Sequence, residues 1–140
     1  MNLLVIDSSV ALAWCFEDEA SPETDAIFDS VRDFGAVVPE LWHLEVANVL
    51  LQAEKRSRIA SADVANRLQL IAALPIMTDR ETTTRAWRET IALARAEKLT
   101  AYDAAYLELA IRRSLPLATK DGALLEAARR VGVAVNAGRA

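Results

Sequence analysis

Leu3-Leu4-Val5-Ile6-Asp7-Ser8-Ser9, close to the start of the chain, is a short apolar run that ends in an acid and two hydroxyl residues. Wholly apolar runs of this length are typical of strands buried on both faces of a parallel sheet. The Asp-Ser-Ser that follows is a helix-capping sequence, so a helix over residues 10–16 is expected next. The stretch therefore predicts a buried strand followed at once by a helix.

Strand and helix signals alternate along the rest of the 140 residues. Further strands are expected at residues 36–38, 75–77, 115–118 and 133–135. Helices are expected at residues 22–33, 41–54, 61–73 (with Ser61 as the N-cap), 80–97, 100–113 and 123–130. This alternation predicts one α/β domain over residues 1–140, with a mainly parallel central sheet and helices on both faces.

The composition is that of a small folded protein, because 53% of the residues are hydrophobic. The single cysteine, Cys15, excludes a disulfide within the chain, as is usual in a reducing cytoplasm. No apolar stretch approaches the ~20 residues of a membrane helix, and the first residues lack the basic leader of a signal peptide. We therefore expect a cytoplasmic protein without a membrane segment. The net charge of −4 argues against a protein that merely coats nucleic acid.

Two acids follow predicted strands. Asp7 ends the first strand, and Asp121 comes after the strand at residues 115–118, with Thr119 and Lys120 between. The structural alternative for each acid is a cap of the helix after it, since aspartate is a common N-cap. In parallel α/β sheets, however, ligands bind beyond the carboxyl ends of the strands, which directs attention to both positions.

A third acid, Glu45, lies in the predicted helix at residues 41–54, which is so apolar that we expect it to be mostly buried. A buried carboxylate is costly unless it is paired or binds a metal. Asn48 lies three positions on, on the same helix face, and the two side chains together suit one polar pocket. The alternative is a buried salt bridge between Glu45 and an arginine.

The fourth acid, Asp103, begins the predicted helix at residues 100–113. With Thr100 it resembles a capping box, which gives it a purely structural alternative. Asp103 nevertheless shares a helix face with Tyr106 and is expected to point inward, whereas Glu108 is expected to face solvent.

Four carboxylates gathered without bases would repel one another strongly. Lys120 is the only base at a fixed spacing from any of them. Such a cluster makes chemical sense when hard cations bind there, and Mg²⁺ and Mn²⁺ prefer oxygen ligands. The sequence therefore predicts a site for Mg²⁺ or Mn²⁺, ions that lower the pKa of a bound water and neutralise charge that develops on a phosphate.

Four stretches together resemble a known family: Val5-Ile6-Asp7-Ser8-Ser9, Glu45-Val46-Ala47-Asn48-Val49-Leu50, Thr100-Ala101-Tyr102-Asp103-Ala104-Ala105-Tyr106 and Leu117-Ala118-Thr119-Lys120-Asp121. In this order and over nearly the whole chain, they resemble the motifs of PIN-domain nucleases, and within them the VapC-type toxins of toxin–antitoxin pairs. The resemblance implies a three-layer α/β/α sandwich and Mg²⁺- or Mn²⁺-dependent hydrolysis of RNA.

Carried over residue by residue, Asp7, Glu45, Asp103 and Asp121 match the acidic quartet of the family. The hydroxyl positions beside the quartet are matched by Ser8 or Ser9 and by Thr119, and the polar position after the glutamate is matched by Asn48. The resemblance also implies a homodimer and a cognate antitoxin that blocks the acidic site. A groove for that partner is expected to use apolar residues that otherwise fill the core, namely Val10, Leu12, Trp14 and Phe16.

Three other assignments compete with a nuclease. A receiver-like phosphoacceptor domain also has acids at strand ends, but it would need a pair of acids after the first strand and leaves Glu45 unexplained. A phosphatase of the haloacid dehalogenase type would need an acid two positions after Asp7, where Ser9 stands. A PIN-like domain that binds RNA without cutting it is disfavoured by the intact quartet.

Other charged and aromatic residues receive structural interpretations. Most bases near helix ends are expected to be solvated, where they suit the helix dipole; they are Lys55, Arg56, Arg58, Arg112, Arg113, Arg129 and Arg130. The three tryptophans, Trp14, Trp42 and Trp87, are expected in the core or at an interface.

Overall fold

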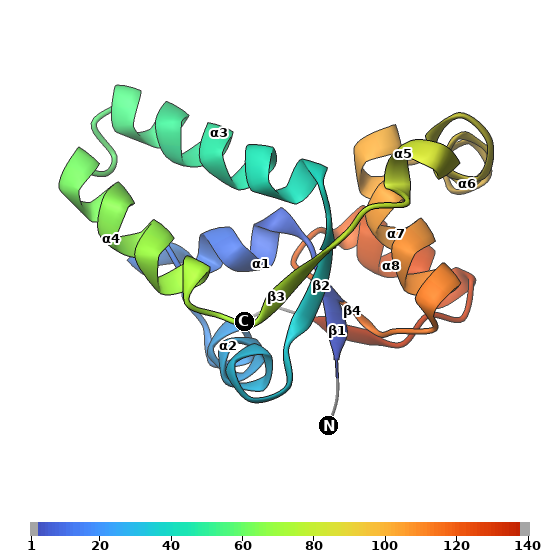
Figure 1. Ribbon diagram of the computed structural model, residues 1–140, viewed down its shortest axis with the longest axis horizontal. Helices are drawn as coiled ribbons and strands as arrows, with labels where there is room; N and C mark the ends of the chain where they lie inside the picture. Colours follow the sequence, from blue (N-terminus) through green and yellow to red (C-terminus); the bar gives the residue numbers. More distant parts are fainter. Residues whose placement is uncertain (1–2, 138–140) are drawn as a thin grey trace.

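The computed structural model describes residues 3–137 and places five parallel strands in one sheet at the centre of the molecule (Figure 1). The order across the sheet is β3-β2-β1-β4-β5. The strands are β1 (Leu4–Ile6), β2 (Ala36–Pro39), β3 (Ile76–Asp79), β4 (Leu117–Thr119) and β5 (Val135–Ala137). Neighbouring strands are parallel throughout, as the strand–helix alternation predicts.

Helices cover both faces of this sheet (Figure 1). One side carries α1 (Ser8–Ala13), α2 (Pro22–Phe34), α3 (Leu41–Lys55) and α4 (Ser61–Ala72). The other side carries α5 (Thr82–Arg85), α6 (Ile91–Glu97), α7 (Ala101–Arg113) and α8 (Gly122–Arg130). The predicted three-layer α/β/α sandwich is thereby confirmed.

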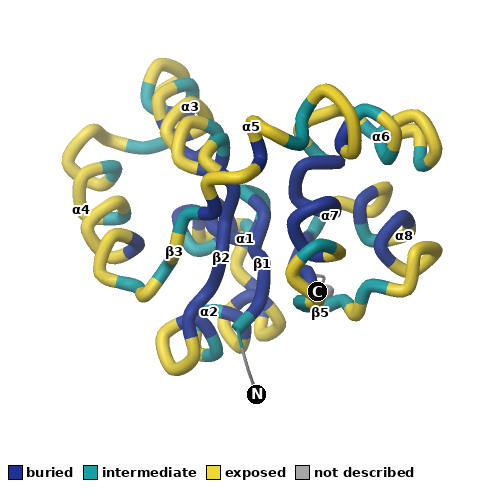
Figure 2. Tube along the Cα trace, turned by 45° about the vertical axis from the view of Figure 1, so that its right-hand side comes forward, coloured by how far each residue is buried: buried dark blue, intermediate teal, exposed yellow. Residues whose placement is uncertain are grey.

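The sheet is buried because its central strands are wholly apolar. All three residues of β1 are buried, and Val5 pairs with Val37 of β2 on one side and with Leu117 of β4 on the other. Figure 2 shows the central strands as the most buried part of the trace. Burying a side chain of this size fully stabilises the fold by roughly 1.5–3 kcal/mol.

The chain order makes the boundary between β1 and β4 a special place. From β1 the chain moves outward through β2 and β3, and it then returns to β4 on the other side of β1. The carboxyl ends of β1 and β4 therefore border the topological switch point, where open α/β sheets bind their ligands.

Local signals fix where α2 begins and ends. Ser21 and Thr24 form a reciprocal capping box, and Pro22 stands at the first helical position. Gly35 ends the helix with φ +93°, and a Cβ there would lie 3.0 Å from the carbonyl oxygen of Pro75. Glycine is therefore required by both the backbone angle and the close approach of β3.

The prediction of a mostly buried helix at residues 41–54 is wrong. Only a stripe of α3 is buried, formed by Trp42, Val46, Leu50 and Ala53. Leu44 is 75% exposed, and Leu51 is 48% exposed. Apolar composition alone does not reveal how much of a helix its neighbours cover, and α3 has only α1 and α4 against it on its side of the sheet.

Other boundaries differ from the predictions in smaller ways. The helix expected at residues 80–97 is split by a π-helical segment, Ala86–Thr90, where Trp87 is 91% exposed, which excludes the core and leaves the expected interface position open. The third strand runs to Asp79 instead of ending at residue 77, and the last strand lies two residues later than expected. Ala60, not Ser61, occupies the N-cap of α4. None of the helices in the described part of the chain is long and apolar enough to cross a membrane.

Candidate functional site

Asp7 lies at the carboxyl end of β1 and is buried, with only 4% of its surface exposed. Its Oδ1 accepts hydrogen bonds from the Ser9 hydroxyl at 2.6 Å and from the backbone N–H of Val10 at 3.3 Å. Its Oδ2 accepts a hydrogen bond from the Thr119 hydroxyl at 2.5 Å. Asp7 is therefore both the N-cap of α1 and the centre of a wider polar network.

Two hydroxyls extend this network to the β4–α8 connection. The Ser9 hydroxyl accepts a hydrogen bond from the backbone N–H of Lys120 at 2.9 Å, and the Thr119 hydroxyl accepts one from the N–H of Asp121 at 2.9 Å. Each hydroxyl donates to Asp7, and two of these bonds cross between the loops: Thr119 donates across to Asp7, and Ser9 accepts across from Lys120. The loops after β1 and β4 are thereby held together at the switch point of the sheet.

Asp121 follows β4 and is exposed. Its Oδ1 accepts a hydrogen bond from the N–H of Leu124 at 2.9 Å, so the residue also caps α8 as the turn sequence predicted. One carboxylate oxygen is engaged by this cap. The capping role and a place in the acidic site are therefore compatible.

Asp103 joins the group from the first turn of α7, where its backbone N–H donates to the Thr100 hydroxyl at 3.1 Å. Its side chain is half-buried. Burial raises the pKa of Asp103, and the negative charges of Asp121 and Glu45 raise it further. The Asp103 carboxylate therefore lies within the electrostatic influence of both Asp121 and Glu45.

Glu45 of α3 meets α7 through Tyr106. The Tyr106 hydroxyl donates a hydrogen bond to Oε1 of Glu45. Burial, followed by the Glu45 carboxylate, raises the pKa of Tyr106, and these effects outweigh the opposite effect of the Ser8 side chain. Tyr106 therefore stays protonated and acts as a donor to Glu45.

The electrostatics of Asp7 reflect a carboxylate without a counter-charge. Burial raises the pKa of Asp7 to about 6, although hydrogen bonds from Ser9, Thr119 and Val10 work in the opposite direction, and the charge of Asp103 adds to the rise. In residues 3–137, no lysine, arginine or histidine forms an ion pair with Asp7, Glu45, Asp103 or Asp121.

Lys120 is the base nearest in sequence, and it points elsewhere. Its Nζ donates to the backbone carbonyl of Glu19 at 3.2 Å and lies 3.9 Å from the Glu19 carboxylate. The acidic site therefore keeps its excess negative charge, which is the condition under which a divalent cation binds favourably.

The donor set suits Mg²⁺ or Mn²⁺. All four side chains offer carboxylate oxygens, which these hard ions prefer, and none is consumed by a base. Within the described residues, no three His, Cys, Asp or Glu side chains stand close enough to form a ready-made cage. Mg²⁺ does not require such a cage, since it commonly keeps several waters and uses one or two carboxylates.

The supporting residues are placed less uniformly. Thr119 is fully buried and bonded to Asp7, whereas Asn48 is exposed on α3 and forms no hydrogen bond with a described residue. Ser8 lies beside Tyr106, and Ser9 makes the bond to Asp7. As the N-cap, Asp7 extends its carboxylate over the first turn of α1. This position explains why Ser9, and not Ser8, donates to it.

A second group of acids lies at the end of β3, and the sequence interpretation missed it. Arg112 of α7 donates to both oxygens of Asp79, at 3.0 and 2.8 Å, and to Oε2 of Glu108 at 2.8 Å. Glu108 is only 6% exposed, so its predicted solvent-facing position is wrong, as is the solvated position expected for Arg112. The Arg112 hydrogen bonds lower the pKa of Asp79.

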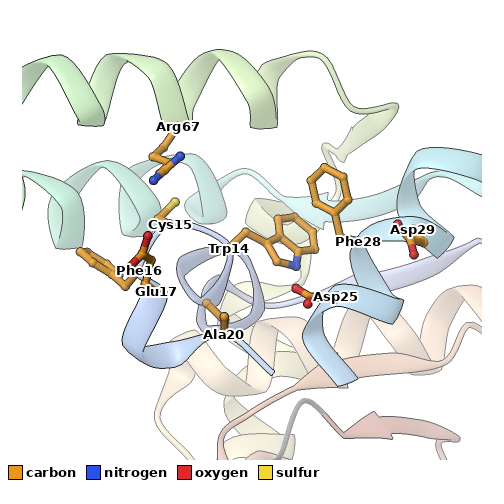
Figure 3. Close-up of a pocket in the computed structure, with 10 residues that line it drawn as sticks. Trp14, Cys15, Phe16, Glu17, Ala20, Asp25, Phe28, Asp29 and Arg67 are labelled. Carbon is orange, nitrogen blue, oxygen red and sulfur yellow. The ribbon is translucent and has the colours of Figure 1, made fainter. Parts of the chain in front are cut away.

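A pocket of about 310 Å³ lies between the end of α1, α2 and α4 (Figure 3). Trp14 forms its wall, donating its indole N–H to the Thr24 carbonyl at 2.9 Å and packing edge-on against Phe28, 5.2 Å away. Arg67 projects into the pocket from α4 (Figure 3). The remaining side chains that were expected to form a groove, Val10, Leu12 and Phe16, are buried in the core, although Phe16 also borders the pocket.

Comparison with known proteins adds independent information. The PIN domain family model matches residues 4–130. No curated protein matches the sequence. Among solved structures, PAE2754 from Pyrobaculum aerophilum is similar over 96% of this chain and 92% of that protein, with 22% identity and a TM-score of 0.69.

Two further solved structures are similar at lower scores. A toxin–antitoxin complex from Klebsiella pneumoniae matches 84% of this chain and 86% of the compared chain, with 16% identity and a TM-score of 0.56. FitAcB from Neisseria gonorrhoeae matches 99% of this chain and 98% of the compared chain, with 20% identity and a TM-score of 0.56.

Proposed function

Because this chain belongs to the PIN domain family, whose members are generally nucleases, we propose that it is a metal-dependent endoribonuclease and the toxin of a toxin–antitoxin pair. The observation that carries the proposal is the set of four carboxylates without ion-pair partners beside the β1–β4 switch point. A purely structural site would pair such acids with bases, as the molecule does at Asp79.

The residues of the site take distinct parts in this proposal. Asp7 and Asp103 are the first candidates to hold Mg²⁺ or Mn²⁺, and Asp121 holds it directly or through water. Glu45 either binds the ion too or accepts the proton of the attacking water. When bound, the ion would supply positive charge to the phosphate and lower the pKa of a water.

The hydroxyl residues orient these acids. Thr119 and Ser9 hold both oxygens of Asp7, which fixes the plane of that carboxylate. Ser8 and the exposed amide of Asn48 are proposed contacts to the RNA phosphates. In the reaction a water oxygen bonds to phosphorus while the bond from phosphorus to the leaving ribose oxygen breaks.

The test is cleavage of single-stranded RNA by the purified protein with Mg²⁺ or Mn²⁺. We expect Asp7→Asn and Asp103→Asn each to lower kcat/KM by at least about 100-fold, the scale of losing one essential polar group. Glu126→Gln, an exposed acid on α8, is the matched control and is expected to keep wild-type activity. Near-wild-type cleavage by both site variants would refute the proposal.

The same assay separates the competing functions. RNA binding without cleavage, in the presence of either metal, would favour the non-cleaving PIN-like alternative. The receiver-like alternative is disfavoured by the sheet, because receiver domains have the strand order 2-1-3-4-5, and this sheet has the order β3-β2-β1-β4-β5.

We propose that the antitoxin partner uses the pocket beside Trp14. The pocket offers two aromatic walls and Arg67 (Figure 3). The Arg67 Nε is buried and has no hydrogen-bond partner among residues 3–137. An apolar side chain accompanied by a carboxylate would satisfy both features. Co-expression with the product of a neighbouring short reading frame should give a complex, and Phe28→Glu should weaken it at least about tenfold. An unchanged affinity of the variant would count against this surface.

A homodimer and a cytoplasmic location complete the proposal. Leu44 is 75% exposed and Trp87 is 91% exposed, so both apolar side chains are available to a dimer interface. The mass of the protein in solution at micromolar concentration tests the dimer, and cell fractionation tests the location. A monomer would contradict the first expectation, and recovery of the protein outside the cytoplasm would contradict the second.

A further inference from the structure

Tyr106 connects the core of the molecule to the rim of the acidic site. Its ring is only 1% exposed, among the largest fully buried side chains of the protein, yet its hydroxyl reaches Glu45 of α3. A core position of this kind is filled equally well by phenylalanine, which has no polar atom to satisfy. The hydroxyl therefore requires an explanation beyond packing.

The position of Tyr106 along α7 relates it to a second acid. Tyr106 lies three residues after Asp103, so the two side chains share one face of the helix. Glu45 is bonded to Tyr106 one turn along α7 from Asp103, and two like-charged carboxylates at such a site repel each other. Without a restraint, the Glu45 side chain would turn away from Asp103 toward solvent.

Glu45 has few other restraints. It is half-buried at the edge of α3, and the Tyr106 bond is the only hydrogen bond or ion pair that its side chain makes with the described residues. A glutamate side chain has three rotatable bonds, and holding it in one rotamer costs on the order of 1–2 kcal/mol of conformational entropy. The hydrogen bond from the rigid, buried Tyr106 hydroxyl offsets this entropy loss, so Glu45 is already held in one rotamer before an ion binds.

We propose that Tyr106 is a positioning residue whose hydroxyl holds the Glu45 carboxylate beside Asp103, so that the acidic site is preassembled for a divalent cation. This inference rests on the proposed function, since it assigns a task to Glu45 within that site. Hydrogen-bond donors that orient metal-binding carboxylates change metal affinity by about 10- to 100-fold when they are removed.

The test measures Mn²⁺ binding directly, without RNA, from the electron paramagnetic resonance signal of free Mn²⁺. Tyr106→Phe keeps the buried ring and removes only the hydroxyl, and it is expected to raise the Kd for Mn²⁺ at least about tenfold. Tyr102→Phe is the matched control, because Tyr102 lies on the same helix next to Asp103 but is 66% exposed. We expect that control to bind Mn²⁺ as the wild type does.

A double-mutant cycle shows whether Tyr106 acts through Glu45. In the Glu45→Ala background, Tyr106→Phe should leave the Kd for Mn²⁺ unchanged, because the group that it positions is gone. At saturating Mn²⁺, the KM of Tyr106→Phe for RNA should equal that of the wild type. A general loss of structure would instead change both the KM for RNA and the Kd for Mn²⁺. Urea denaturation of each variant verifies that the fold is intact.

The outcomes separate this inference from the proposed function. Equal Mn²⁺ affinity of Tyr106→Phe and wild type, or an equal loss in the Glu45→Ala background, overturns the positioning role and leaves the nuclease proposal standing. If Tyr106→Phe binds Mn²⁺ more weakly than wild type, but the wild-type protein cuts no RNA, the positioning role is supported and the nuclease proposal is overturned. A wild type that binds no Mn²⁺ overturns both.

Discussion

Two groups of acids lie at the edge of the sheet formed by the carboxyl ends of the strands. One group is paired with an arginine, and the other has no basic partner among the described residues. At the end of β3, Asp79 and Glu108 of α7 share one guanidinium, Arg112, with bonds of 2.8–3.1 Å. At the ends of β1 and β4, Asp7 is just as buried but receives only neutral donors, and no described base pairs with it or with Asp103.

The pKa values record this difference. The bonds from Arg112 lower the pKa of Asp79, whereas burial raises the pKa of Asp7 to about 6. The first group is neutralised internally and contributes to the stability of the fold. The second is left with a charge that the fold does not compensate, which is the arrangement expected of a functional site.

The largest expected effect concerns the compensated group. Arg112→Met should destabilise the protein by roughly 3–5 kcal/mol, because it leaves two carboxylates buried without their counter-charge. Urea denaturation at pH 7.5 measures the loss. Arg113→Met, at the exposed neighbouring position, is the control and should change stability by less than about 0.5 kcal/mol. Equal effects of the two variants would show that the Arg112 cluster is not what stabilises this edge of the sheet.

For the acids without a basic partner, substitution should raise the stability of the protein instead of lowering it. In chelator-treated protein at pH 7.5, Asp7→Asn should be more stable than wild type, by on the order of 2 kcal/mol, because it removes a buried charge. The amide oxygen keeps one of the two hydroxyl bonds, and the other hydroxyl can turn to accept from the amide NH₂. Glu126→Gln should have no such effect. A destabilised Asp7→Asn protein would mean that the charge is compensated in a way the geometry does not reveal.

The pH dependence of the two groups sharpens the contrast. The folded state of wild type holds the Asp7 proton more tightly than the unfolded state, so the advantage of Asp7→Asn should be full above pH 6 and vanish by about pH 4. For Asp79 the pKa is lowered, so its stabilising contribution should persist down to pH 4 and disappear at lower pH. Denaturation curves of wild type, Asp7→Asn and Asp79→Asn at pH 7.5, 5 and 3.5 would test the two opposite trends.

The smallest expected effect is the gain in stability on binding Mn²⁺, which should depend on the acids near Asp7 and not on Asp79. Mn²⁺ at ten times its Kd should stabilise the wild type by about 1.4 kcal/mol. The increment should be unchanged in Asp79→Asn and absent in Asp103→Asn, when each is compared with its own metal-free form. Differential scanning fluorimetry with and without Mn²⁺ provides the measurement, and equal increments in both variants would place the ion elsewhere.

Much of the fold could be predicted from local patterns. The apolar run before Asp7 predicted β1, and the Ser21-Pro22 start and Gly35 end predicted α2 within a residue. The prediction of a buried α3 was wrong because hydrophobicity does not state which elements pack on a helix. The π-helical segment at Ala86–Thr90 was missed, since it leaves no periodicity of its own in the sequence.

For the site, sequence patterns named acids but not their partners. Nothing in the spacing distinguishes Asp7, which stays unpaired, from Asp79, which lies 33 residues in sequence from its partner Arg112. The bond from Tyr106 to Glu45 joins residues 61 apart. Pairings over such separations depend on how helices are laid across the sheet, which the periodicity within each helix does not encode.

The sequence alone determined the number and order of the strands and the main helices, and that Asp7 and Asp121 follow strand ends, because these features depend on neighbouring residues and on backbone preferences. The tertiary structure alone decided which of those carboxylates received an arginine and which kept an open charge. That choice depends on the order β3-β2-β1-β4-β5, which places Asp79 beside Arg112 of α7 and Asp7 beside the β4–α8 loop, whose Lys120 side chain turns away to Glu19. Electrostatic pairing is a matter of distance in space, and only the packed chain fixes that distance.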